Sequence, residues 1–177
     1  MTSAAVTPAG RVRDRLSIDL IRRRLPGGTL GRHMYLFELA GSADTVLAGL
    51  AAAGAEDGTV VLAEVGAHVR VAVLLRPDLP LRAAPAFAAL AALALAEAVD
   101  AGAPASVEAT LCARGADWVI VGAGADGVAD PNAFAATFLD GLDRWCARYA
   151  AEGPAALLAA WRTRKRPSRE EPSDARQ

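Results

Sequence analysis

The chain has 177 residues, a formal net charge of −1 and an apolar content of 53%. This length favours one domain with a sizeable hydrophobic core. The balanced charge argues against an electrostatic surface for nucleic acid or an anionic membrane. The first residues lack the basic and apolar pattern of a signal peptide, and the longest uncharged apolar run, residues 83–96, is too short to cross a bilayer. We therefore expect a soluble protein that binds neither nucleic acid nor membrane.

Cysteine, lysine and aromatic residues are scarce. Cys112 and Cys146 have no motif spacing around them, so we interpret them as free thiols and the protein as cytoplasmic. Arginine occurs 18 times, whereas the one lysine, Lys165, lies near the C-terminus and outside the predicted domain. Aromatic residues make up 5% of the chain. We expect much of the core to come from five of the large ones: Trp118, Phe134, Phe138, Trp145 and Trp161.

Short helices and strands alternate along the chain. In order, they are a helix over Ser17–Leu25, a strand over His33–Leu39, a helix over 42–53, a hairpin of Thr59–Glu64 and Val69–Arg76, a helix over Arg82–Ala101, a second hairpin of Ser106–Cys112 and Asp117–Gly122, and helices over 130–149 and 154–161. Ser17, Ser42 and Asp130 are predicted helix caps. Gly122-Ala123-Gly124 is predicted to be a loop that ends its strand.

This order of elements predicts an α+β fold, with helices packed on a mixed, largely antiparallel sheet. The domain is expected to span residues 14–162. A flexible lead-in, residues 1–13, precedes it, and a disordered charged tail, residues 163–177, follows it.

The segment Gly58–Pro80 carries the most informative pattern. Its Gly-Thr-Val-Val-Leu-Ala-Glu and Leu-Leu-Arg-Pro sequences resemble two strands of the biotin protein ligase catalytic domain, which has the class II synthetase-like fold of the biotin/lipoate ligase superfamily. Between them, Gly66-Ala67 predicts a two-residue turn, because glycine supplies the positive φ. The resemblance covers roughly residues 30–162 and continues, in the family's order, through Gly41-Ser42-Ala43-Asp44 and the segment 118–126.

Three motifs that carry the chemistry of this family are missing. Its Gly-Arg-Gly-Arg loop would lie where this chain has Gly66-Ala67, its Lys-Trp-Pro-Asn-Asp segment where it has Ala101–Ala105, and its Lys-x-x-Gly motif near Ser106–Ala109. The family reaction uses ATP to convert biotin to biotinyl-adenylate and then biotinylates a lysine of a carrier protein. We therefore assign no catalytic residue, and biotin and ATP are cofactors only if ancestral activity remains.

The resemblance links six residues to ligand binding, as vestiges of the family's site. They are Ser42, Asp44, Glu64, Gly122, Gly124 and Asp126. Ser42 is a helix cap or a residual biotin contact, and Glu64 is a solvated charge or an acid–base group. The two glycines belong to a tight exit turn or a weak phosphate loop. Asp126 places negative charge where a nucleotide would need a neutral or positive group.

Few other side chains are candidates for chemistry. Arg70, Arg76 and Arg114 are the nearest cations in sequence, and each is as readily a solvated arginine at a strand end or turn. His33 and His68 have no partners at metal-ligand spacing, so no metal site is predicted.

These observations lead to three hypotheses. The first is a degenerate ligase-like domain that is catalytically inactive or impaired. The second is a non-catalytic partner of an intact ligase or a biotin carboxyl carrier domain, or a homodimer that forms by sheet extension. The third is a divergent but active ligase whose chemistry is supported by arginines.

Overall fold

The computed structural model describes residues 15–38, 42–77, 84–102, 104 and 106–164. The predicted lead-in, the predicted boundaries at Leu39 and Arg82, and residues 165–177 of the predicted tail lie outside these residues. The described helices and strands, in chain order, are α1 (Ile18–Arg24), β1 (Met34–Phe37), α2 (Ala43–Ala52), β2 (Val60–Val65), β3 (His68–Leu75), α3 (Ala84–Gly102), β4 (Ser106–Arg114), β5 (Val119–Asp126), α4 (Pro131–Glu152) and α5 (Pro154–Arg164).

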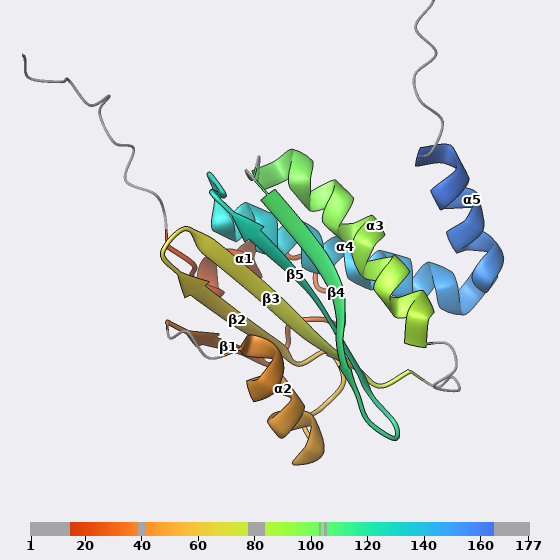
Figure 1. Cartoon of the computed structure of the whole chain (residues 1–177), viewed down its shortest axis with the longest axis horizontal. Coiled ribbons are helices and arrows are strands. Elements are labelled where there is room, and N and C mark those ends of the chain that lie inside the picture. The colour runs from red at the N-terminus through yellow and green to blue at the C-terminus, as the bar shows by residue number, and fades with distance from the viewer. Residues whose placement is uncertain (1–14, 39–41, 78–83, 103, 105, 165–177) are drawn as a thin grey trace, which may run out of the picture.

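The five strands form one sheet in the order β1-β2-β3-β5-β4 (Figure 1). β1 runs parallel to β2, and the other three neighbouring pairs are antiparallel. Helices pack on both faces of this sheet. The predicted α+β class, with a mixed and largely antiparallel sheet, is confirmed.

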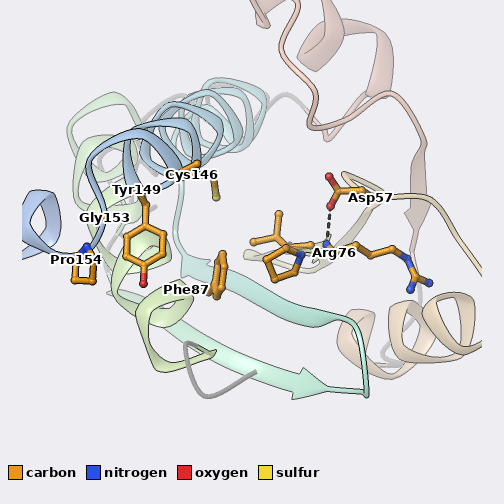
Figure 2. A pocket seen from close by; sticks show the side chains of 10 residues that line it. Asp57, Arg76, Phe87, Cys146, Tyr149, Gly153 and Pro154 are labelled. Atoms are coloured by element: carbon orange, nitrogen blue, oxygen red, sulfur yellow. Dashed lines mark hydrogen bonds between the residues drawn. The ribbon is translucent and has the colours of Figure 1, made fainter. Parts of the chain in front are cut away.

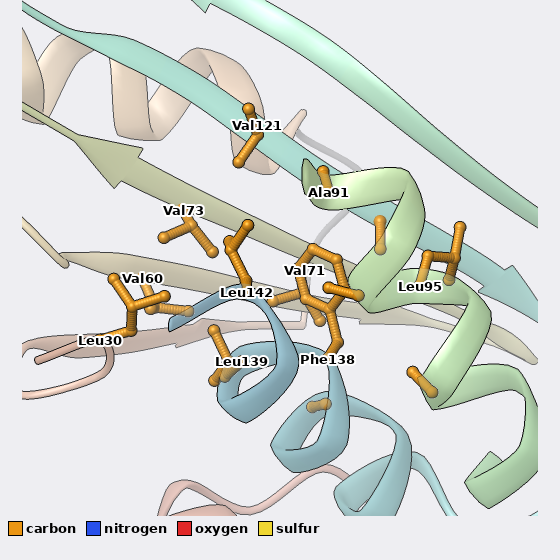
Figure 3. Packing of buried hydrophobic residues seen from close by; sticks show 14 of the residues in the cluster. Leu30, Val60, Val71, Val73, Ala91, Leu95, Val121, Phe138, Leu139 and Leu142 are labelled. Carbon is orange, nitrogen blue, oxygen red and sulfur yellow. The ribbon is translucent and has the colours of Figure 1, made fainter. Parts of the chain in front are cut away.

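One face of the sheet lies under α3 and α4 and holds the main core. Phe138 of α4 is fully buried and packs near Val71 of β3 and the other strand residues that point to this side (Figure 3). Gly141 allows α4 to approach α3 closely, because a Cβ at this position would lie 3.3 Å from the Cα of Ala94. Interdigitated apolar side chains at native density account for most of the stability of such a layer.

The opposite face is covered by α2, which spans only part of it. Leu47 of α2 is fully buried against a smaller cluster that includes Val61, Ala72 and Leu74, the strand residues of the opposite parity. Toward the β2–β3 turn, the same face carries polar side chains instead. This face is therefore packed at one end and polar at the other.

The predicted caps and the first predicted turn are confirmed. Ser17, Ser42 and Asp130 each accept a backbone hydrogen bond at the start of a helix. Gly66 has a φ of 59°, and the residues on either side of Gly66-Ala67 pair directly, so β2 and β3 are joined by a two-residue turn.

Two predictions about the C-terminal half are wrong. Gly122-Ala123-Gly124 does not end its strand, because β5 continues to Asp126 and pairs with β3 and β4 along this segment. Trp161 is 46% exposed, since α5 buries Ala156 toward the core and turns the indole outward. The same helix continues to Arg164, three residues beyond the predicted end.

Candidate functional site

Strand alternation decides which predicted site residues come together. In β5, Gly122, Gly124 and Asp126 share the face of Ile120, which packs in the cluster under α2. The first turn of α2 reaches the same polar end, where Asp44 pairs with a β3 side chain. The structure therefore brings five of the six predicted residues to the α2 face of the sheet: Ser42, Asp44, Gly122, Gly124 and Asp126.

Arg70 of β3 links α2 to β4 across this face. Its Nη2 donates to Asp44 Oδ2 at 3.0 Å, and its Nη1 donates to Glu108 Oε1 at 2.9 Å. The Arg70 side chain is only 12% exposed, whereas that of Glu108 is 61% exposed. A largely buried guanidinium thus lies between two carboxylates that neutralise it. In the sequence, Arg70 is one of three candidate cations, whereas Glu108 carries no local signal of a site.

Gly124 makes this ion pair possible, because Arg70 and Glu108 lie on the two strands that flank β5. A Cβ at Gly124 would lie 3.0 Å from Cγ and Oε1 of Glu108 and 3.3 Å from Nη1 of Arg70. The glycine therefore lets the ion pair cross directly over the backbone of β5. This contact explains why small residues occur in a strand interior, where a sequence pattern alone favours a turn.

Asp126, at the end of β5, joins two neighbouring strands. Its carboxylate contacts His68 Nδ1 at 2.9 Å and accepts a hydrogen bond from Ser106 Oγ at 2.9 Å. These two hydrogen bonds, that of His68 first, hold the pKa of Asp126 below its ordinary value. The Ser106 hydroxyl thus donates to the aspartate, so the three side chains do not form the serine–histidine–aspartate relay of a nucleophilic hydrolase.

Two adjoining hollows occupy the polar end of the α2 face. The larger, about 460 Å³, is lined by Ser42, Asp44, Val65 and Arg70, among others. The smaller, about 180 Å³, lies over the end of β5. His68 and Glu108 line both hollows, so the two hollows are continuous.

Two further candidates, Glu64 and Arg76, lie elsewhere. Glu64 points to the opposite face of the sheet, where its Oε2 accepts a hydrogen bond from Leu16 N at 2.9 Å. Arg76 lies at the far end of β3 and donates to the Ala51 and Ala55 carbonyls and to Asp117. The structure therefore does not bring Glu64 or Arg76 to the polar end of the α2 face.

Within the described part of the chain, no group of three or more histidine, cysteine and acidic residues is placed to hold a metal ion. In the same residues, no helix has the combined length and hydrophobicity needed to span a bilayer.

Similar folds occur among solved structures. A biotin protein ligase-like protein of unknown function from Silicibacter sp. TM1040 matches with a TM-score of 0.62 and 16% identity, over 77% of this chain and 80% of that one. A mutant biotin protein ligase from Aquifex aeolicus in complex with biotin matches with a TM-score of 0.49 and 11% identity, over 69% and 73%. No protein-family model and no curated protein matches the chain. The first likeness supports the predicted biotin/lipoate ligase-like fold.

Proposed function

We propose that this chain, which has a biotin/lipoate ligase-like fold, is a non-catalytic member of that structural class. Its α2 face keeps the positions of a ligand site but does not activate a carboxylate with ATP. The balance of charge on this face carries the proposal. Among the described residues that line the two hollows, Asp44, Glu108 and Asp126 are acidic, whereas Arg70 and His68 are the basic ones.

This charge balance is unsuited to adenylate formation. The reaction brings together a carboxylate and a polyphosphate, and it requires preorganised positive charge where negative charge develops in the transition state. Here the Arg70 guanidinium is already held by Asp44 and Glu108. A nucleotide would have to displace at least one of these carboxylates and approach the other acidic groups. The net repulsion opposes ATP binding.

The short turn between β2 and β3 supports the same proposal. Enzymes that make reactive intermediates usually need a segment that closes over the site and excludes water. Beside the larger hollow, the connection between β2 and β3 consists of Gly66 and Ala67, between strands that pair up to the turn. Two residues are too few to cover a bound adenylate.

A direct assay tests the proposal. Purified protein is incubated with biotin or with lipoate, labelled ATP and a carrier domain, and both adenylate and labelled carrier are measured. An intact biotin protein ligase in parallel shows that the carrier and the conditions are competent. We expect no adenylate above the blank without protein, and no change in the Arg70→Met variant. Adenylate that exceeds the blank and falls in Arg70→Met would instead support a divergent active ligase.

A second candidate function is a non-catalytic assembly partner, and the edges of the sheet favour it. Among the described strands, β1 and β4 end the sheet, and each carries exposed apolar side chains: Tyr35 at 44%, Phe37 at 39% and Val107 at 43%. Such edges can add a strand from another chain. Sedimentation of the protein alone, with an intact ligase and with a carrier domain tests this role. A monomer that forms no complex at micromolar concentration would contradict it.

A further inference from the structure

A cavity of about 400 Å³, separate from the two hollows, lies on the side of the sheet away from α2 (Figure 2). It is called the second cavity below. The end of β3, the start of α3 and the end of α4 surround it. Most of its lining is apolar and includes Leu75, Pro77, Phe87 and Pro154. This volume and character are typical of a pocket for a small organic molecule.

Two aromatic residues form one wall of this cavity. Phe87 and Tyr149 meet edge to face, with ring centroids 6.1 Å apart. They are 5% and 9% exposed, so both rings are largely buried. The wall that they form suits the apolar body of a small organic molecule.

The charges around the cavity favour a cation. Asp57 lines it at one end, and the Arg76 guanidinium extends away from the aromatic pair and is occupied elsewhere (Figure 2). Burial, together with the charges of Asp143 and Asp57, raises the pKa of the Cys146 thiol in this lining to about 12. Asp57 therefore places a carboxylate at one end of an apolar cavity, and aromatic faces also attract ammonium groups.

We propose that this cavity binds a small lipophilic amine in its protonated form. The apolar body of the ligand packs between Phe87 and the end of α4, and its ammonium group lies toward Asp57. This site is separate from the polar end of the α2 face and does not depend on the function proposed for it.

Three isosteric probes test the charge preference: phenylbutylamine, phenylbutanol and phenylbutyrate, each titrated calorimetrically into the full chain. We expect the amine to bind about fivefold more tightly than the alcohol, since one partly exposed ion pair contributes up to about this much. Phenylbutyrate should bind most weakly. Equal affinities for the three probes, or no binding of any at millimolar concentration, would overturn the proposal.

Single substitutions test whether the probes bind in this cavity. Asp57→Asn keeps an acceptor for the Arg76 backbone N–H but removes the charge, so the amine should then bind only as well as the alcohol. Asp100→Asn, on the exposed end of α3, makes the same charge change elsewhere and should have no effect. Ala150→Phe should fill the cavity and abolish binding of all three probes. If that variant does not fold, the comparison of Asp57→Asn with Asp100→Asn still tests whether the amine binds beside Asp57. Equal loss of amine affinity in both would refute the assignment.

Discussion

The face of the sheet under α3 and α4 and the polar end of the α2 face are held in order by opposite kinds of contact. Under α3 and α4, fully buried side chains such as Phe138 exclude water, and the strands contribute valines of one parity. At the polar end of the α2 face, the described contacts are ion pairs and hydrogen bonds around Arg70 and Asp126. The same strands contribute side chains to both regions. The difference shows that the sheet is stabilised mainly from one side, which leaves the other side free to vary in chemistry.

Among the variants that test this contrast, Phe138→Ala should have the largest effect on stability. Removal of a fully buried phenyl ring should lower the free energy of unfolding by about 3–5 kcal/mol, through lost burial and a residual cavity. Urea denaturation measures the change. Val65→Ala, at a 44% exposed position on the rim of the larger hollow, should change it by less than about 0.5 kcal/mol. Similar losses for both variants would contradict the proposed division of the faces.

Gly124→Val tests whether the Arg70–Glu108 ion pair needs a glycine where it crosses the backbone of β5. Valine favours strands, yet its side chain would push Glu108 and Arg70 apart, so we expect a loss of about 1–3 kcal/mol. Adding Glu108→Ala should recover part of the loss, as a coupling of at least about 0.5 kcal/mol in a double-mutant cycle. Gly49→Ala, where no atom lies within 4 Å of the new Cβ, should not destabilise the protein. Strict additivity of Gly124→Val and Glu108→Ala would disprove the steric explanation.

Arg70→Met measures the ionic contribution directly. The variant leaves Asp44 and Glu108 without this guanidinium, and we expect a loss of about 1 kcal/mol that shrinks at high salt. Arg15→Met removes the exposed Arg15–Glu38 pair and should lose no more than about 0.5 kcal/mol. A larger effect at Arg15 than at Arg70 would argue against a structural role for the bridge.

The smallest expected effect is a change in stability at acidic pH. Because the folded-state pKa of Asp126 is lowered, its contribution to stability is present above the ordinary value of 3.8 and is lost as the pH falls through the lower folded value. The difference in stability between the wild type and Asp126→Asn should therefore narrow below about pH 4. Thermal unfolding from pH 7 to pH 3 measures it. A difference that stays constant over this range would show that the hydrogen bonds of Asp126 do not favour its charged form.

Local patterns in the sequence predict much of the fold, because caps and tight turns depend on neighbouring residues. Ser42 caps α2 and Gly66 turns the first hairpin, as their residue types and positions indicate. The extent of β5 was not predictable in this way. Arg70 and Glu108 are 38 residues apart, and only their pairing across the sheet explains why Gly124 lies within a strand rather than a turn.

The candidate site was predictable only in part, for a related reason. The resemblance pointed to positions, and strand parity then separates Glu64 from Asp126. The second cavity has no local signal, because Asp57, Phe87 and Tyr149 come from three distant parts of the chain. Their meeting depends on how α3 and α4 pack against the sheet.

The Gly66-Ala67 turn also makes the protein a scaffold for engineering. Val65 and His68 pair directly beside it, and the turn residues are exposed, so a longer segment inserted there would leave the packed core unchanged. Each doubling of loop length costs only about 0.6 kcal/mol in closure entropy. An arginine-rich loop grafted at this point would lie next to the larger hollow, and activity could be sought by changing loop and surface while the hydrophobic layer beneath stays constant.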